Sequence, residues 1–317
     1  MTTVVFLFLC YDDILNAKAW ARFFQDDAKA QTIAHFKTKE AAEKATKKFP
    51  WLSHSFSEVE TKYGYPSLLE AEVFLYAKAK ELFPAAGGYL YTSGCSAPIL
   101  SLKYMEVNLL EKSWSNGRFQ KTAIQKLPDF DYKPVFGMNL QRFNQFKFLP
   151  AAMAADYCAA VKTDPDLCEI SAKLETYFVE NRIERTENPK RGQERPECYL
   201  EEILFGHWLK IAYMRKKGIP MSAYDDIPLE IWQRGQLVNT PVVYLDPRTS
   251  CNTPIDQRNC WVKHETVSLC SKIMTTEQAL ECIVDQGAIF LRHVENESLS
   301  ENFPFRNVLD LKNTLQN

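Results

Sequence analysis

The sequence has little glycine and proline, with 11 Gly and 16 Pro among 317 residues. This content excludes a collagen-like repeat and a chain made mostly of flexible linkers. Neither charge is in excess, because 38 Lys and Arg residues oppose 40 Asp and Glu residues and the formal net charge is -2. A balanced charge provides no general attraction to nucleic acid or to an acidic membrane. We therefore expect neither of them as a partner.

Long hydrophobic runs are also missing. The apolar run at residues 4–9 is too short to span a membrane, and no basic residues precede it as they would in a signal peptide. We expect no membrane span and a cytoplasmic location, where thiols stay reduced. The nine cysteines form no C-x-x-C pair, which argues against a zinc ribbon. We expect mostly free thiols, and a disulfide between Cys251 and Cys260 stays open.

What is present is the composition of a folded protein. Hydrophobic residues make up 46% of the chain and charged residues 25%. This apolar fraction is ordinary for a globular chain and too high for intrinsic disorder. The length allows one large domain or two modest ones.

The first hundred residues alternate between strand and helix patterns. Continuous apolar runs predict buried strands at residues 3–10, 32–36 and 89–91. Helical spacing predicts a helix from Asp12 or Asp13 through Phe24, one over 37–48, and one from a capping Ser67 to Pro84. Crossover helices join neighbouring parallel strands, so this alternation predicts an α/β fold of the Rossmann type. Its mixed, mostly parallel sheet would be flanked by helices.

The rest of the chain is less regular. Strands are predicted at residues 135–138, 146–149, 242–245 and 288–292, and helices at 151–161, 164–181, 199–216 and 275–284. The helix over 199–216 carries apolar residues on one side and ends before Gly218. The charged segment 180–197 is either an exposed connector or a lid beside an active site. No linker divides the chain, so we expect a single domain.

Several catalytic fingerprints are absent from the sequence. No G-x-G-x-x-G motif or Walker loop follows the first strand, which argues against a dinucleotide-binding fold or a P-loop NTPase. No Asp-x-Asp pair follows the strand at 89–91, where a divalent metal would need carboxylates to bridge a diphosphate. A bound diphosphate would then need Arg, Lys and helix N-termini to balance its charge.

Three local features are candidates for chemistry. The segment 92–99 follows a predicted buried strand, and it is either a tight turn or a loop that lets a ligand approach the backbone. Glu201 and Glu202 open a predicted helix, where they either complement the helix dipole or supply a general base. Two basic pairs in the C-terminal third are either surface charge or contacts for an anion. They are Lys263-His264 and Arg292-His293.

Seven segments, in chain order, are similar to the motifs of one glycosyltransferase family: residues 6–11, 32–37, 63–72, 93–99, 144–149, 199–205 and 287–293. Residues 93–99, Ser-Gly-Cys-Ser-Ala-Pro-Ile, give the best match, to a loop in which a small residue precedes two variable positions and Pro-Ile or Pro-Leu. Residues 199–205 resemble a helix start whose Glu is the catalytic base. The chain thus resembles the core-2/I-branching beta-1,6-N-acetylglucosaminyltransferase family, which also includes the peptide O-xylosyltransferases.

The resemblance implies a GT-A-like fold that transfers a sugar, with inversion and without a metal, from a UDP-sugar to a hydroxyl of a glycan or glycoconjugate. It makes Glu202 the general base, with Glu201 as the reserve. Residues 1–100 would form the nucleotide-binding half of the single domain 1–317, and residues 101–317 the acceptor and diphosphate half. The implied donor-binding residues are Tyr11, His35, Ser93, Gly94, Lys263, His264, Arg292 and His293. The implied acceptor-binding residues are Ser96, Gln145 and Lys147.

Two of the positions that depart from the family pattern keep a second function open. Ser96 stands where some members carry Asp, and His293 stands where the family has Lys. The alternative is a non-catalytic relative that binds a nucleotide or a carbohydrate. A sulfotransferase fits less well, because the acidic Tyr11-Asp12-Asp13 does not suit a phosphate-binding loop. The donor sugar, the acceptor, the linkage and the oligomeric state are left open by the sequence.

Overall fold

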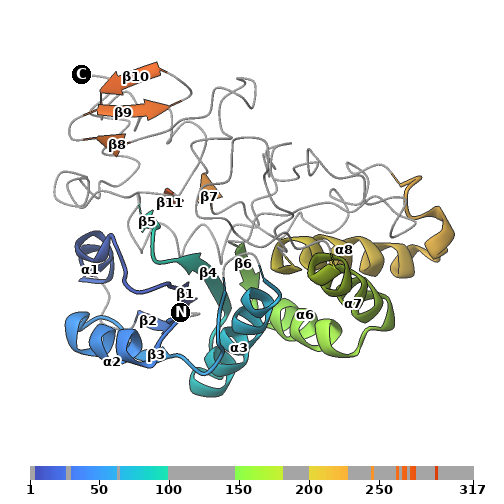
Figure 1. Cartoon of the computed structure of the whole chain (residues 1–317), viewed down its shortest axis with the longest axis horizontal. Coiled ribbons are helices and arrows are strands. Elements are labelled where there is room, and N and C mark those ends of the chain that lie inside the picture. The colour runs from blue at the N-terminus through green and yellow to red at the C-terminus, as the bar shows by residue number, and fades with distance from the viewer. Residues whose placement is uncertain are drawn as a thin grey trace.

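The computed structural model describes residues 4–25, 30–62, 65–98, 147–180 and 200–227, together with five short strands between residues 244 and 291. A five-stranded sheet with the order β3-β2-β1-β4-β6 lies at the centre of this part (Figure 1). Its strands are β1 (Val4–Leu9), β2 (Gln31–His35), β3 (His54–Phe56), β4 (Gly88–Ser93) and β6 (Lys147–Pro150). The pairs β1–β2, β1–β4 and β2–β3 are parallel, and β6 runs antiparallel to β4. The predicted α/β class and mostly parallel sheet are confirmed.

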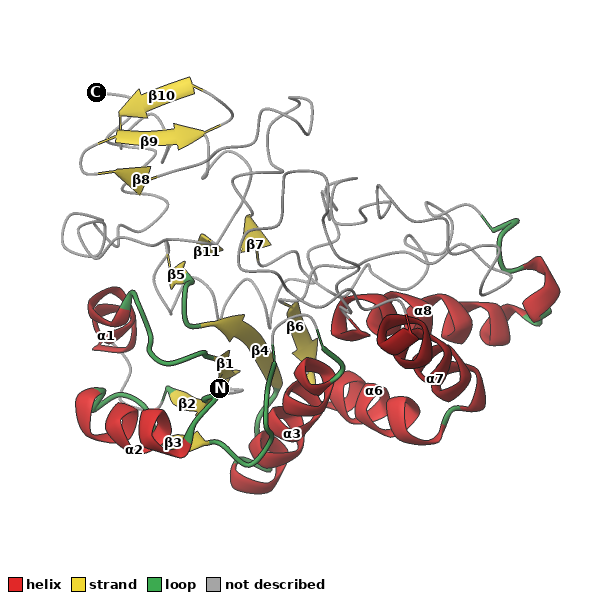
Figure 2. Ribbon diagram, viewed as in Figure 1, coloured by secondary structure: helices red, strands yellow, loops and turns green. Residues whose placement is uncertain are grey.

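Helices cover both faces of the sheet. The helices are α1 (Ala17–Gln25), α2 (Lys39–Lys48), α3 (Ser67–Leu82), α6 (Ala151–Thr163), α7 (Pro165–Glu180) and α8 (Leu200–Lys217), with a 3-10 helix at Met221–Ala223. In Figure 2, α1 and α2 lie on one side of the strands, and α3 and α6 lie on the other. Right-handed crossovers require this arrangement, because the chain moves outward from β1 to β3 and returns through α3 to the far side of β1.

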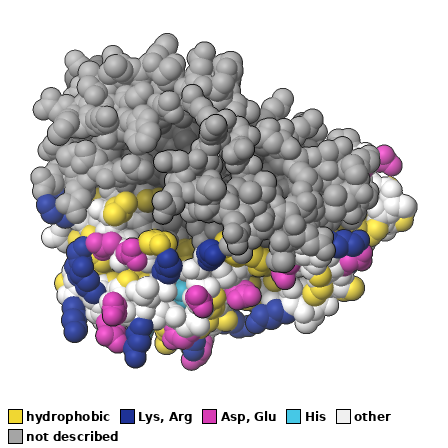
Figure 3. Space-filling model, viewed as in Figure 1, with side chains coloured by type: hydrophobic (Ala, Val, Ile, Leu, Met, Phe, Trp, Pro, Cys, Tyr) yellow, Lys and Arg dark blue, Asp and Glu magenta, His cyan; other side chains and the backbone are white. Residues whose placement is uncertain are grey.

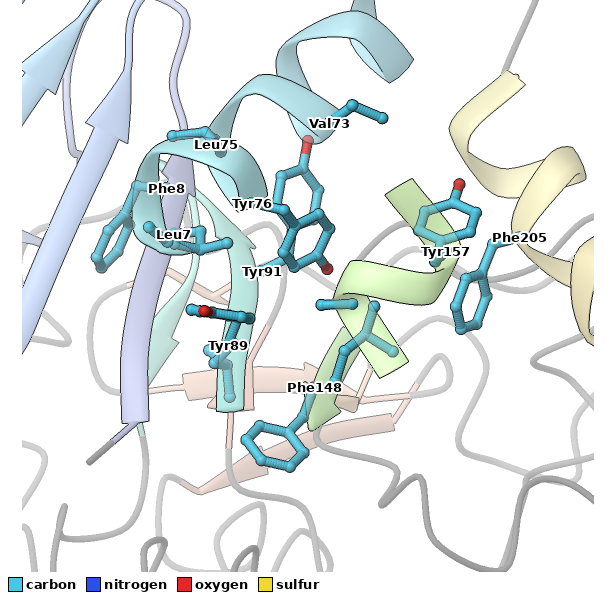
Figure 4. Packing of buried hydrophobic residues seen from close by; sticks show 14 of the residues in the cluster. Leu7, Phe8, Val73, Leu75, Tyr76, Tyr89, Tyr91, Phe148, Tyr157 and Phe205 are labelled. Atoms are coloured by element: carbon cyan, nitrogen blue, oxygen red, sulfur yellow. The ribbon is translucent and has the colours of Figure 1, made fainter. Parts of the chain in front are cut away.

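The alternation of side chains along the strands builds a core on each face. On one face of β1, Phe6 and Phe8 pack edge-on against Trp20 of α1, with ring centroids 6.1 and 4.8 Å apart. On the other face, Tyr89 and Tyr91 of β4 lie against α3 (Figure 4). Every side chain of β1 except that of Leu9 is buried, as the continuous apolar run predicts.

Two small sheets complete the described topology. One has the strand order β10-β9-β8, formed by β8 (Val262–Lys263), β9 (Thr266–Leu269) and β10 (Lys272–Thr275). In the other, β11 (Phe290–Leu291) lies between β5 (Ala97–Pro98) and β7 (Tyr244–Leu245). The antiparallel β5–β11 pair brings the loop after β4 next to a strand near the C-terminus.

Several expectations about the elements need correction. Ser67 is the first helical residue of α3 rather than its cap, because Pro66 takes the N-cap position and the Ser67 hydroxyl accepts a bond from the Lys62 N–H. Helix α8 is buried around nearly its whole circumference from Leu200 to Met214, not on one side. Helix α1 begins at Ala17 rather than after a cap at Asp12 or Asp13. Strands β3, β8, β9 and β10 were not predicted. The predicted strand at 135–138 and nearly all of the segments 180–197 and 275–284 lie outside the described residues.

Candidate functional site

The carboxyl ends of the parallel strands meet at one edge of the sheet, which we call the carboxyl edge. Strand order reverses between β1 and β4, because the chain leaves β1 toward β2 and later returns to the opposite side of β1. In open α/β sheets, ligands bind in the crevice outside the carboxyl ends at such a reversal. The residues that follow β1 and end β4 are therefore the first candidates for a binding site.

Gly94 lies directly after β4, closely packed against the loop that follows β1. Its N–H donates to the Leu9 carbonyl at 3.1 Å, and its carbonyl accepts from the Leu15 N–H at 2.8 Å. A Cβ atom at this position would lie 2.5 Å from the Asp13 carbonyl oxygen and 3.2 Å from Cys10 Sγ. Only glycine therefore fits without a shift of the backbone, and the close approach links the two strand ends.

Ser93 and Ser96 form a hydrogen-bonded turn after β4. The Ser96 side chain is buried, and its hydroxyl lies 2.9 Å from the Thr92 hydroxyl and 3.0 Å from that of Ser93. The Ser96 carbonyl accepts bonds from Trp20 Nε1 at 2.9 Å and Asn16 Nδ2 at 3.2 Å. These contacts fix the loop onto α1, while Ser93 is the partly exposed member of the pair. Contact of Ser96 with an acceptor stays a prediction.

Tyr11 presents an exposed aromatic ring at the carboxyl edge. Its side chain is 61% exposed, which is unusual for a large apolar group. Lys37, two residues after the end of β2, donates a hydrogen bond to the Tyr11 hydroxyl, and its Nζ lies 4.1 Å from the ring centroid. The end of β1 thus carries an aromatic surface with an ammonium group above it.

His35, the last residue of β2, is fully buried. Its Nε2 accepts a hydrogen bond from the Val59 N–H at 3.2 Å, so the proton of the neutral ring lies on Nδ1. Burial lowers the pKa of His35 to about 4. The geometry makes His35 an anchor for the chain that follows β3, and its contact with a donor nucleotide stays a prediction.

A buried ion pair lies between α3 and the sheet. Lys147, the first residue of β6, pairs with Tyr91 of β4 near the carboxyl edge. Its Nζ lies 2.9 Å from Glu72 Oε1, and the two side chains are only 5% and 0% exposed. Burial raises the pKa of Glu72 to about 7, against the pull of the Lys147 charge. The pair is therefore fully desolvated, and each charge depends on the other.

The start of α8 reaches the same ion pair. Lys147 Nζ lies 3.4 Å from the main-chain carbonyl oxygen of Glu201, with geometry that makes it a donor to that oxygen. Glu201 and Glu202 are both buried, at 0% and 2% exposure. Burial raises the pKa of Tyr157 on α6, and the charges of Glu72 and Glu201 raise it further. Successive helix residues point about 100° apart, so Glu202 faces a different direction from Glu201.

The structure thus brings together a subset of the predicted site residues. The ends of β1 and β4 carry Tyr11, Ser93, Gly94 and Ser96, and the β4–β6 side carries Lys147, Glu201 and Glu202. The β5–β11 pair places the strand that precedes Arg292 beside residues 97–98. Gln145, His264, Arg292 and His293, and the side chain of Lys263, lie outside the described residues.

Sequence reasoning did not single out Glu72, Lys37 or Trp20. Glu72 had a detectable signal, since it lies at helical spacing from Leu69 and Tyr76, within the apolar face of α3. A carboxylate in such a face needs a buried partner, and Lys147 is that partner. The contacts of Lys37 and Trp20 join segments far apart in the sequence and carry no local signal.

Within the described ranges, no group of three His, Cys, Asp or Glu side chains could hold a metal ion. None of the described helices is long and apolar enough to cross a membrane. In the face drawn in Figure 3, basic and acidic side chains alternate over the described surface, in keeping with the balanced composition. No protein-family model matches the chain, and a search of curated proteins gave no match.

Proposed function

We propose that this protein is a GT-A-like, inverting glycosyltransferase that transfers a sugar from a UDP-sugar to a hydroxyl group of a glycan or glycoconjugate without a metal cofactor. The observation that carries the proposal is the position of the α8 N-terminus. Two adjacent carboxylates begin this helix, and Lys147 joins its first turn to the β4–β6 side of the carboxyl edge. A donor bound at the end of β1 and β4 would lie on the same edge of the sheet.

Glu202 is the base in this proposal. A general base removes the proton of the acceptor hydroxyl as its oxygen attacks the anomeric carbon, and the bond from that carbon to the UDP oxygen breaks. Glu201 is fully buried in the first turn of α8. Successive helix residues point about 100° apart, so Glu202 faces a different direction from Glu201.

Residues at the carboxyl edge support the part of the proposal that concerns binding of the UDP-sugar donor. The exposed Tyr11 ring offers a surface on which a nucleobase can stack. Gly94 keeps the main chain free of side-chain bulk between the two strand ends. The leaving UDP gathers negative charge, and fixed cationic groups stabilise it. We assign this role mainly to Arg292, because His293 takes the place of the family's lysine, with Lys263 or His264 as the second contact.

The experiment compares two single substitutions. We expect Glu202→Gln to keep the fold and to lose about 10²–10⁴-fold in turnover, the usual contribution of a positioned base. Glu201→Gln is the matched control, because it removes the neighbouring charge on the same turn. Transfer is measured as UDP release with a panel of UDP-sugars and acceptors. If Glu201→Gln loses the activity and Glu202→Gln keeps it, the assignment is off by one residue.

Transfer should also continue in EDTA. Complete loss of turnover that Mn²⁺ restores would contradict the metal-independent mechanism.

One observation favours the second function, a non-catalytic nucleotide- or carbohydrate-binding protein. Glu202 is only 2% exposed, so an acceptor hydroxyl reaches it only after the surrounding chain moves. A binding protein needs no such movement. Calorimetry with UDP and the UDP-release assay separate the two, because UDP binding without release from any UDP-sugar would support the binding protein.

A further inference from the structure

We propose that Lys147 and Glu72 are positioning residues, which hold the first turn of α8 and thereby set the place of Glu202 relative to the carboxyl edge. This inference rests on the proposed function for its catalytic consequence. It replaces the expectation that Lys147 binds the acceptor.

Lys147 contacts the start of α8 in two ways. Its Nζ lies 3.4 Å from the Glu201 carbonyl oxygen and 4.6 Å from the ring centroid of Phe205, one turn further along the helix. Both contacts come from the same ammonium group, whose stem is fixed because Lys147 is part of β6. The strand therefore holds the residues on either side of Glu202 along the chain.

Among the described residues, aromatic and acidic side chains enclose Lys147. Its side chain is only 5% exposed, and its Nζ lies 5.8 Å from the ring centroids of both Tyr91 and Tyr157. Tyr157 and Phe205 lie side by side in Figure 4, with ring centroids 5.2 Å apart. Glu72 completes this enclosure from α3. A hydroxyl that bound Lys147 would first have to break the enclosure.

Glu72 is needed because Lys147 lies at an unfavourable end of a helix. The N-terminus of α8 carries the positive end of the helix dipole, which repels a cation. The carboxylate of Glu72, 2.9 Å from Lys147 Nζ, offsets this repulsion and the cost of burying the ammonium. The two residues therefore act as a unit, and removing either one releases the turn that carries Glu202.

The test compares Lys147→Met, the double variant Glu72→Leu/Lys147→Met and a matched control. The control is Lys173→Met, which breaks an exposed ion pair with Glu169 on α7. We expect Lys147→Met to lower kcat up to about 10²-fold with little change in the KM of donor or acceptor, because a small misplacement of a catalytic group has this effect. The double variant leaves no unpaired buried charge, so it should recover stability and still have a low kcat.

Amide hydrogen exchange provides a readout that does not depend on activity. Exchange should become faster in residues 201–205 in both Lys147 variants, and stay unchanged in residues 210–216 and in the control. A raised acceptor KM with unchanged kcat and exchange would overturn the inference and restore acceptor binding to Lys147. Recovery of kcat in the double variant would also overturn it, because the effect would then be one of stability alone.

Different outcomes would contradict the proposed function and the positioning role of Lys147. If the unaltered protein transfers no sugar but exchange in residues 201–205 still rises in the variants, the reaction is wrong and the anchoring of α8 is right. If turnover depends on Glu202 but neither kcat nor exchange responds to Lys147→Met, the reaction stands and the positioning role is wrong.

Discussion

Gly94→Ala tests whether the close approach of the two strand ends is as tight as the structure indicates. The added methyl group would lie 2.5 Å from the Asp13 carbonyl oxygen, closer than any real contact of this kind, and the opposing atom belongs to the main chain. Overpacking of this type costs about 1–3 kcal/mol. The lower entropy of the unfolded alanine chain returns about 0.4–1 kcal/mol. The middle of the two ranges gives a net loss of about 1.3 kcal/mol in the free energy of unfolding.

Urea denaturation at pH 7 measures this loss, and Gly218→Ala is the matched control. Gly218 follows α8 with a φ of +68°, and a Cβ atom added there would meet no other atom within 4 Å, so its alanine variant is strained by conformation alone. Its cost should be about 1–2 kcal/mol. Gly94→Ala should in addition weaken UDP binding, which Gly218→Ala should leave unchanged. Equal stability and equal UDP affinity for Gly94→Ala and the unaltered protein would refute the packing argument.

Three further predictions concern stability. Trp20→Phe removes the bond from the indole N–H to the Ser96 carbonyl, which keeps its bond from Asn16 Nδ2. The lost hydrogen bond should cost about 0.5–1.5 kcal/mol in urea denaturation, and an unchanged midpoint would contradict it. The hydrogen bonds and charge of Arg215 lower the pKa of Asp164. The Asp164–Arg215 ion pair therefore stabilises the fold at pH values above 3.8, the ordinary pKa of Asp, and this stabilisation is lost as the pH falls below 3.8. Arg215→Ala should therefore show a shallower loss of stability in acid than the unaltered protein, and an equally steep loss would refute this. Burial lowers the pKa of His207 to about 3, so stability should fall as the pH drops from about 6.5, by at most about 1.4 kcal/mol per pH unit from this group. His207→Gln should make stability depend less on pH below about 6.5. An unchanged pH dependence would show that other groups cause the loss.

The sequence predicted the central strands and most helices well, because their signals are local. The continuous apolar run at 3–10 matches β1 (Val4–Leu9), and the predicted helix over 37–48 matches α2 (Lys39–Lys48), which Thr38 caps through its side chain. Strand β3 was missed because it has only three residues, all of them outside the buried core. Its pairing with β2 at the sheet edge comes from tertiary contact, not from a pattern of its own.

The burial of α8 was predicted incorrectly for a physical reason. Periodicity assigns polar residues to a solvated face, but His207 and Lys210 are buried at 0% and 3% exposure. His207 Nδ1 hydrogen-bonds the Tyr224 hydroxyl, and Lys210 Nζ lies 3.9 Å from the ring centroid of Tyr224. Polar groups with such partners can enter a core. The partner residue belongs to the turn after the helix, so the helix sequence alone does not reveal it.

The two sides of the candidate site differ in the same way. At the end of β4, the Ser93 and Ser96 side chains bond within a few positions, and the short segment 93–96 was recognisable without the fold. The bonds of Gly94 to Leu9 and Leu15, and of the Ser96 carbonyl to Trp20, form only in the folded chain. On the β4–β6 side, Lys147 was predicted to lie on a strand, but its function depends on Glu72 and Glu201, which reach it only in the folded chain. Substitutions in the first region leave no buried charge without its partner. Substitutions in the second should be strongly non-additive, because a single change leaves a buried charge that a paired change removes.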